Sequence, residues 1–214
     1  MSRFFIGITG ASGHAYAEAL VRALVAAGHE VDLALTAAGS KVLRHELGVD
    51  AGAGGVGLAT ELPSWLGADV ASSVRAFAAD AIEAPPSSGT ALTAAFILCP
   101  CSMGTLARVA AGFSSNLVER AADVALKEGR QLVIVPRETP LSVVHLENMA
   151  RLARLGAVIL PAMPGFYHAP RTVEDLVSHV VGKVLDRLGV EHALGARWTG
   201  IGEPPDEPGL GGDG

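Results

Sequence analysis

The sequence predicts a three-layer α/β protein, in which one parallel sheet lies between two layers of helices. Short apolar runs alternate with stretches whose apolar residues recur at helical spacing, which indicates repeated strand and helix units. Most of the predicted strands end in a cluster of Gly, Pro, Ser or Thr: TGASG, TAAGS, CPCSMG, PRETP and PAMPG. Ligands of open parallel sheets bind at the carboxyl ends of the strands, so these loops form the predicted ligand edge.

The individual elements follow from this alternation. Predicted strands cover residues 4–8, 30–36, 94–99, 131–135 and 157–160. Predicted helices cover residues 15–26, 40–47, 105–111, 116–128, 143–155 and 172–188. Residues 49–90 are rich in Ala, Gly and Ser with little periodicity, and only a helix over 58–66 is predicted there. We expect a single domain over residues 1–190 and a C-terminal extension over 191–214, disordered from about residue 200, where Gly, Pro and Asp dominate.

Composition excludes several classes of protein. The chain has 214 residues, the size of one domain, and its 50% hydrophobic content is enough for a large core. A net charge of -6 and the lack of a basic run argue against a nucleic-acid partner. The uncharged stretch 86–107 contains Gly89, Pro100 and Gly104, so we interpret it as a buried strand and its loop rather than a membrane span. No secretory signal is recognisable at the N-terminus, so we expect a cytoplasmic protein.

Neither the cysteines nor the histidines form a metal motif. Cys99 and Cys101 are the only cysteines and one residue separates them, so they supply neither a disulfide framework nor four zinc ligands. No two histidines have the H-x-x-x-H spacing. We expect no metal, and we interpret these residues as structural.

The first loop, residues 9–13, joins a strand to a helix. Free N–H groups and the helix dipole at such a junction favour an anion or the polar edge of a cofactor. The loop is not a dinucleotide fingerprint, because Ile8 stands where G-x-G-x-x-G needs glycine. It is not a nucleophile elbow either, because His14 stands where G-x-S-x-G needs glycine. A ligand loop and a simple tight turn both remain open.

Two later loops carry polar groups at the same predicted edge. Ser102 and Thr105 begin a helix, where they can cap it or hydrogen-bond a ligand, and Met103 can fill the core or lie against a flat ring. Arg137 and Glu138 stand between two prolines, which stiffen the loop. They form either a surface ion pair or a site for phosphate binding and proton transfer.

Charged residues of the helix over 116–128 also allow two interpretations. Arg120, Asp123 and Lys127 lie on one stripe of it at i, i+3 and i+7. Such a stripe is commonly a solvated set of salt bridges. In this apolar half of the chain, inward-facing cations would instead need an anionic partner such as phosphate. The uncharged loop over 160–170 adds Tyr167, whose ring and hydroxyl suit a lid or an apolar wall.

Six segments, in this order and spacing, resemble the UbiX-type flavin prenyltransferases, formerly described as 3-octaprenyl-4-hydroxybenzoate carboxy-lyases. They are TGASG, CPCSMGTLA, NLVERAADVALKE, VPRETPL, HLENM and GAVILPAMPGFYH, and the resemblance covers about residues 3–190. It implies a flavodoxin-like, Rossmann-type fold and a homododecamer with active sites between subunits. It also implies an enzyme that joins the dimethylallyl group of dimethylallyl monophosphate to N5 and C6 of reduced FMN. The prenylated FMN would serve a UbiD-type decarboxylase, in ubiquinone biosynthesis or in aromatic acid decarboxylation.

The same resemblance implies roles for individual residues. Glu138 would be the acid/base group, and Ser12, with Glu46 nearby, would relay a proton to the leaving phosphate. The residues implied to bind the prenyl phosphate are Arg120, Lys127, Tyr167 and Lys183, with Lys127 also counted as catalytic. The residues implied to bind FMN are Gly10, Ala11, Ser12, Thr36, Ser102, Met103, Gly104, Thr105 and Arg137.

These residue types suit the implied chemistry. Breaking an allylic C–O bond produces a delocalised cation and a phosphate dianion, which need apolar walls and cations respectively. Closing a ring at C6 requires loss of a proton, for which a carboxylate in an apolar pocket is suitable.

The sequence departs from the family pattern at four positions. Lys183 replaces the usual arginine and loses its bidentate fork, which puts the phosphate affinity in doubt. Ala37 stands where a lysine is common, and His14 and Ala17 replace small residues near the first loop.

Three other functions compete with this one. A cysteine-type flavoprotein decarboxylase is disfavoured because Pro164 stands where its P-x-M-N segment has asparagine. A non-catalytic flavin carrier, or a subunit of an aromatic-acid decarboxylase complex, would not need the cations and the carboxylate. An NAD(P)-dependent reductase is disfavoured by the missing G-x-G-x-x-G.

Overall fold

The computed structural model describes residues 1–195, which form one six-stranded parallel sheet in the order β3-β2-β1-β4-β5-β6. The order reverses between β1 and β4, as in doubly wound folds that bind ligands at this switch point. The predicted parallel sheet of a flavodoxin-like, Rossmann-type fold is therefore confirmed. The strands are β1 (Arg3–Ile8), β2 (Glu30–Leu35), β3 (Val74–Phe77), β4 (Thr93–Cys101), β5 (Leu132–Pro136) and β6 (Val158–Ile159).

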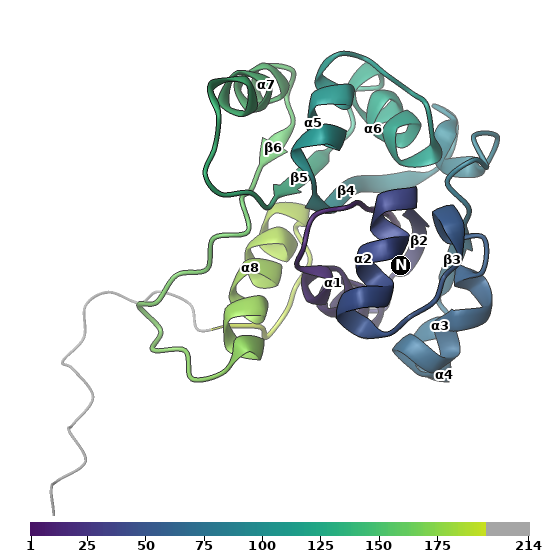
Figure 1. Ribbon diagram of the computed structural model, residues 1–214. Coiled ribbons are helices and arrows are strands. Elements are labelled where there is room, and N and C mark those ends of the chain that lie inside the picture. The colour runs from purple at the N-terminus through teal and green to yellow at the C-terminus, as the bar shows by residue number, and fades with distance from the viewer. Residues whose placement is uncertain (196–214) are drawn as a thin grey trace, which may run out of the picture.

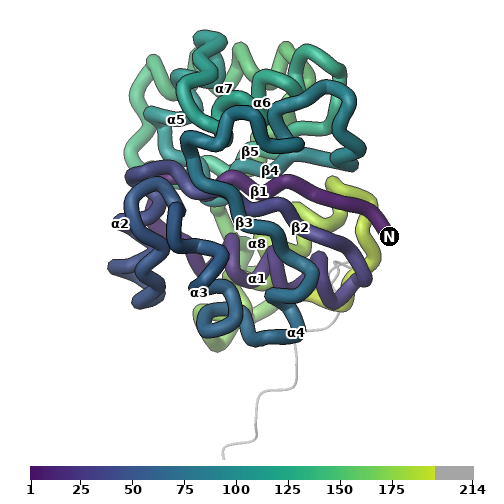
Figure 2. Tube along the Cα trace, turned by 90° about the vertical axis from the view of Figure 1, so that its right-hand side faces the viewer, coloured from purple at the N-terminus to yellow at the C-terminus, as the bar shows by residue number. Residues whose placement is uncertain are grey.

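Helices cover both faces of the sheet, which confirms the three layers (Figure 1). One layer holds α1 (His14–Ala26), α2 (Ala37–Leu47), α3 (Leu58–Leu66), α4 (Ala68–Ala71) and α8 (Val173–Leu188). The other holds α5 (Met103–Ala110), α6 (Leu117–Lys127) and α7 (Val143–Arg154). Figure 2 shows the two layers on opposite sides of the central strands. None of the helices within residues 1–195 is both long enough and apolar enough to cross a membrane.

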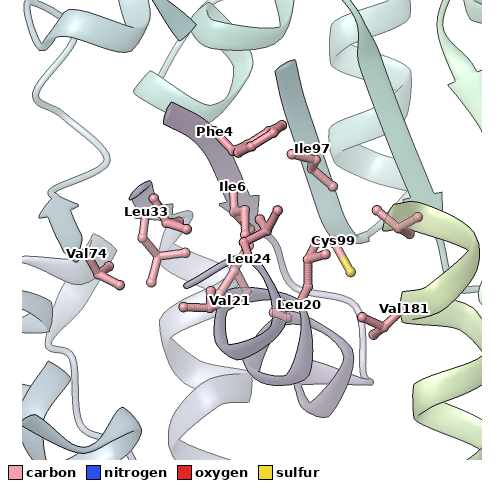
Figure 3. Close-up of a cluster of buried hydrophobic side chains, with 14 of the residues drawn as sticks. Phe4, Ile6, Leu20, Val21, Leu24, Leu33, Val74, Ile97, Cys99 and Val181 are labelled. Carbon is pink, nitrogen blue, oxygen red and sulfur yellow. The ribbon is translucent and has the colours of Figure 1, made fainter. Parts of the chain in front are cut away.

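Each face of the sheet has its own hydrophobic core. Side chains alternate along a strand, so Phe4 and Ile6 of β1 join the core shared with α1 and α8, whereas Phe5 joins the core shared with α5, α6 and α7. Figure 3 shows the first core, in which Leu20 and Leu24 of α1 lie against the strands. On the opposite face, a Cβ at Gly7 would come within 2.6 Å of Cγ1 of Val118, so glycine lets α6 pack close to β1.

Several element boundaries differ from the sequence prediction. β2 ends at Leu35, because Thr36 caps α2, and α2 starts at Ala37 rather than at residue 40. β4 extends to Cys101, which pairs with Pro136, so both cysteines lie in the strand. The helix over 58–66 is confirmed.

One strand was missed by sequence reasoning. β3 pairs with β2 at the edge of the sheet, with only four residues, and Arg75 within it is charged. That charge is compensated by Asp32 of β2, a buried carboxylate whose Oδ1 lies 2.8 Å from Nε of Arg75 and 3.0 Å from Nη1 of Arg3.

The packed part of the chain continues past the expected boundary at residue 190. His192 and Leu194 fold back on α8, where the ring of His192 and the carbonyl of Leu194 would lie 3.1 Å from a Cβ at Gly182. The disorder expected from about residue 200 lies outside the described residues.

Candidate functional site

The first loop brings Ser12 and Glu46 together. Glu46, in the last turn of α2, accepts hydrogen bonds from the N–H of Gly13 at 3.0 Å and of His14 at 2.9 Å, and the Ser12 side chain also hydrogen-bonds to it. Burial, the largest single influence, raises the pKa of Glu46, but the bonds from Ser12, His14 and Gly13 together outweigh it and lower that pKa. Glu46 therefore stays ionised beside Ser12.

This arrangement occupies two of the N–H groups that the sequence offered to a ligand at the first loop. The free N–H groups that begin α1 are occupied by the Glu46 carboxylate, so they do not offer an empty anion site. The loop instead packs closely on α2, since a Cβ at Gly10 would lie 2.6 Å from Cβ of Ala38.

A buried hydroxyl ties the first loop to the loop after β4. Thr9 is fully buried, and its Oγ1 donates to the Pro100 carbonyl at 2.9 Å and accepts from the Ser102 N–H at 2.7 Å. This joins the carboxyl ends of β1 and β4, the two strands of the switch point. Sequence reasoning did not single out Thr9, because a threonine that ends an apolar strand carries no distinctive pattern.

Two predicted cofactor residues cap helices whose N-termini meet this edge. Thr36 begins α2, and its side chain accepts from the Gly39 N–H at 3.0 Å. Ser102 begins α5, accepts from the Thr105 N–H at 3.4 Å and hydrogen-bonds to the Thr105 hydroxyl at 3.2 Å. Each helix still has first-turn N–H groups without an intrahelical partner, which can bind an anion. Met103 is mostly buried and packs in the core with residues of α6 and α7.

Arg137 and Glu138 do not pair with each other. Nε of Arg137 donates to the Ser12 carbonyl at 3.2 Å, while Glu138 accepts from the N–H of Thr139 at 2.9 Å. Both line a cavity of about 440 Å³ together with Ala162 and Met163 from the loop after β6. The structure thus brings Arg137 to the Ser12 loop and leaves Glu138 facing this cavity.

The α6 cations do not join these loops within one chain. Arg120 lies on the outer face of α6, where Nη1 is 3.0 Å from Asp123 Oδ2 and the two side chains are 39% and 34% exposed. Lys127 ends α6 at the opposite edge of the sheet, close to where β4 and β5 begin, and pairs with Glu128. In the single chain the stripe is a set of exposed salt bridges.

Tyr167 and Lys183 gather around a pair of histidines that sequence reasoning treated as separate. The Tyr167 ring packs edge-on against His168 and His179, with centroids 5.5 Å and 5.4 Å away. His179 and Lys183 line one cavity of about 390 Å³ beside Leu160 and Met163. No periodicity connects a loop histidine to a helix histidine eleven residues later, so only the fold shows this cluster.

The cysteines do not contribute a nucleophile. Burial raises the pKa of both thiols, and that of Cys101 reaches about 12. A thiol with so high a pKa is protonated at neutral pH and unreactive. No group of three or more potential His, Cys, Asp or Glu metal ligands occurs within residues 1–195.

Comparisons with known proteins assign the family. The model of the Flavoprotein family matches residues 2–185. The flavin prenyltransferase UbiX of Halalkalibacterium halodurans is 48% identical over 195 residues, which cover 91% of this chain and 92% of the relative. The chain belongs to the UbiX flavin prenyltransferase family. The resemblance seen in the six sequence segments is thereby confirmed.

Solved structures of UbiX-like proteins share its fold. A dodecameric FMN-dependent UbiX-like decarboxylase from Escherichia coli O157:H7 is 41% identical, with a TM-score of 0.80 and coverage of 92% of this chain and 100% of the other. AnUbiX (PadA1), solved in complex with FMN and dimethylallyl pyrophosphate, is 35% identical, with a TM-score of 0.82 and coverage of 94% and 99%. The chain is therefore a flavin-dependent prenyltransferase of this family.

Proposed function

We propose that this UbiX-family chain transfers a dimethylallyl group from dimethylallyl monophosphate to N5 and C6 of reduced FMN. The observation that carries the proposal is the joining of Ser12, Glu46 and Arg137 at the switch point of a fold that matches UbiX proteins over more than nine-tenths of the chain. Reduced FMN supplies the nucleophilic positions when it is bound. The chain supplies the binding groups, the charges and the proton transfers.

The donors at the switch point fit FMN. The N-terminal turns of α2 and α5 offer N–H groups and two capping hydroxyls, which suit a phosphate and the polar edge of a flavin. Glu46 excludes an anion from the start of α1, so we assign the FMN phosphate to the other helix N-termini. The residues assigned to FMN are Gly10, Ala11, Ser12, Thr36, Ser102, Met103, Gly104, Thr105 and Arg137.

Ser12 and Glu46 form the proton relay of the proposal. A carboxylate with a lowered pKa that accepts from Ser12 holds the hydroxyl in one orientation. For a proton to reach the phosphate, Glu46 would first take one up; the protonated carboxyl would then donate to the Ser12 oxygen while the Ser12 hydroxyl gives its own proton to an oxygen of the departing phosphate. Glu138, which faces the cavity after β5, is assigned the removal of the proton at C6.

The prenyl phosphate is assigned to Tyr167 and Lys183 of one subunit and to Arg120 and Lys127 of neighbouring subunits. Lys127 lies at the edge of the sheet opposite the ligand loops, so a single chain cannot deliver it to the site. The E. coli UbiX-like relative is a dodecamer. A homododecamer with sites between subunits gives Lys127 access to a neighbouring site.

The product would be used by a UbiD-type decarboxylase, in cytoplasmic synthesis of ubiquinone or in decarboxylation of aromatic acids.

Direct turnover tests the proposal. The protein is incubated anaerobically with reduced FMN and dimethylallyl monophosphate, and the flavin is analysed by mass spectrometry. We expect the flavin to gain one dimethylallyl unit and inorganic phosphate to be released in equal amount. Glu138→Gln should stop before ring closure, because the amide cannot take the C6 proton. An unmodified flavin with the wild-type protein would refute the proposed activity.

Subunit mixing tests the assignment of Lys127. Lys127→Ala and Lys183→Ala chains are each inactive if both groups bind the phosphate, but co-assembled oligomers would regain about a quarter of the native sites when the two lysines come from different subunits. Lys183→Ala mixed with Tyr167→Ala is the control, since both residues then come from the same chain and no native site forms. Failure of the first mixture to regain activity would place both lysines in one chain.

A further inference from the structure

Two histidines far apart in the chain stack face to face beside the assigned phosphate residues. His168 comes from the loop after β6 and His179 from α8, and their rings lie 4.9 Å apart with an interplanar angle of 1°. Tyr167 closes the cluster, with its ring edge-on to both imidazoles. Such a parallel arrangement places two titratable rings in contact.

Within residues 1–195, His168 has no hydrogen-bond partner for either ring nitrogen, although both nitrogens are buried. An imidazole carries at least one N–H donor in every protonation state. A buried donor without an acceptor is unfavourable, and native proteins rarely leave one. The ring is therefore suited to a ligand that brings an acceptor.

The surroundings favour an anionic acceptor. His179 and Lys183 lie one turn apart on α8 and line the same cavity of about 390 Å³. Met163 lines this cavity and also the one that contains Arg137 and Glu138, so the two spaces adjoin. A cation and one imidazole thus line a cavity next to the proposed reaction site, and the second imidazole stacks on the first.

In the free protein His179 is disposed to be neutral. Burial, followed by the nearby His168 and Lys183, lowers the pKa of His179. An anion placed against the rings reverses this influence, because a negative charge favours the protonated imidazole. Binding of a dianion would then take up a proton.

Few other charges act on the pair in the described chain. Helix α1 packs on α8, but its charged residues Glu18 and Arg22 turn towards Trp65 and Leu66 of α3. The remaining titratable or charged groups around the pair are Tyr167, Asp175, Lys183, Asp186, Arg187 and His192.

We propose that His168 and His179 form, with Lys183, a proton-coupled subsite for the phosphate group of the prenyl donor. This inference rests on the proposed function, because it adds two residues to the site of its phosphate substrate. In the free enzyme burial keeps His179 neutral, and the incoming dianion brings a proton onto the stacked rings. The positive charge on the pair then compensates for the bidentate hydrogen bonding that an arginine would give the phosphate and that Lys183 does not.

Anion titration of the FMN-loaded, oxidised protein tests the subsite without turnover. Sulfate is the probe, because it remains a dianion between about pH 6 and 8, where histidines titrate. Isothermal titration calorimetry in buffers of different ionisation enthalpy reports both the affinity and the protons taken up. We expect sulfate to bind more tightly as the pH falls, by up to about tenfold per pH unit, with net proton uptake.

Two substitutions separate the pair from the rest of the site. His179→Phe keeps a flat ring for stacking, and His168→Asn keeps a polar side chain, but each removes one titratable group. Both should flatten the pH dependence and raise KM for dimethylallyl monophosphate several-fold, with a smaller change in kcat. His45→Gln, at the exposed end of α2, removes a histidine elsewhere and should keep the wild-type dependence.

The outcomes separate this inference from the proposed function. Absent sulfate binding, or a pH dependence that survives in both variants, would overturn the subsite even if the enzyme prenylates FMN. Proton-coupled sulfate binding by a protein that never modifies FMN would refute the proposed activity and leave an anion site. Circular dichroism of each variant checks that it is folded. If no sulfate binds to the wild-type protein, that titration alone rejects the subsite, whatever the variants do.

Discussion

At the scale of single residues, Glu46 decides what the first loop can bind. A strand–glycine–helix junction is normally an anion site, because the first N–H groups of the helix lack partners. Here a carboxylate from α2 takes those groups and holds the Ser12 hydroxyl as well. One side chain from a different helix thereby occupies N–H groups that could otherwise bind an anion, and it contacts the serine of the proposed proton relay.

We predict that Glu46→Gln lowers kcat by at least about tenfold and destabilises the fold by about 1–3 kcal/mol, because the charge-assisted bonds to Gly13 and His14 are lost. Urea unfolding and the rate of flavin modification measure the two effects. Glu83→Gln, at an exposed loop position, is the matched control and should change neither. Unchanged kcat in Glu46→Gln would remove this carboxylate from the relay.

His14 is a second residue whose role depends on burial. It is fully buried, with Nε2 3.0 Å from the Thr9 carbonyl, and burial lowers its pKa more than the Thr9 bond and Glu46 raise it. The unfolded chain therefore binds a proton at His14 more readily than the folded protein does. This stabilising contribution is complete above the ordinary histidine pKa and is lost as the pH falls through the lower folded value.

We predict that wild-type stability decreases as the pH falls below about 6.5 and that His14→Ala makes this decrease shallower. At neutral pH the variant should be less stable, because it loses the bond to Thr9 and leaves a cavity. Urea unfolding at several pH values measures both effects. If the free energy of unfolding fell equally steeply with pH in the wild type and in His14→Ala, His14 would not take up a proton on unfolding. His45→Gln controls for the loss of one histidine.

At the scale of elements, the site depends on how strand ends are joined. β1 and β4 are neighbours, and the Thr9 hydroxyl links their carboxyl ends by bonding to both Pro100 and Ser102. The same loop region receives Arg137 from the end of β5. The loops assigned to FMN are thus held by hydrogen bonds as well as by the apolar core below them.

We predict that Thr9→Val destabilises the fold by about 1–3 kcal/mol, because valine leaves the partly buried Ser102 N–H without its acceptor. It should also weaken FMN binding, since the loops after β1 and β4 lose their connection. Urea unfolding and flavin fluorescence titration measure the two effects. Thr60→Val, at an exposed position of α3, should leave both the stability and the FMN affinity unchanged. A Thr9→Val protein that binds FMN as tightly as the wild type would argue against the link between the two loops.

At the scale of the whole molecule, the single chain exposes apolar surface that an oligomer would cover. Val143, Val144 and Leu146 of α7 are 68%, 61% and 51% exposed. Lys127, in turn, ends α6 at the edge of the sheet opposite the ligand loops of its own chain. The proposed dodecamer would account both for the exposed apolar residues and for the proposed role of Lys127 in a neighbouring site.

We predict that Val144→Glu breaks the assembly into smaller species, because it places a charge in a surface that association would bury. Light scattering after size-exclusion chromatography measures the mass, and circular dichroism checks the fold. Val56→Glu, at an equally exposed apolar residue near η1 (Ala53–Gly55), should keep the native mass. A full-sized Val144→Glu oligomer would show that this part of α7 lies outside the contacts.

The sequence by itself determined the layers, most elements and the family. Apolar alternation is local, so it predicts β1 or α8 without knowledge of their neighbours. It failed at β3, because this short edge strand carries Arg75, which is compensated only by Asp32 on the adjacent strand. The roles of Ser12, Glu138 and the phosphate residues were implied by the family resemblance and stay predictions.

Only the tertiary structure decided which residues meet. The bonds of Glu46 to the start of α1, of Thr9 to the loop after β4, and the stacking of His168 on His179 all join segments that no local pattern relates. Each contact depends on the order in which the strands lie side by side, which is set by packing over the whole sheet. Hydrophobic periodicity encodes the face that a residue turns to the core, but it does not encode the partner it finds there.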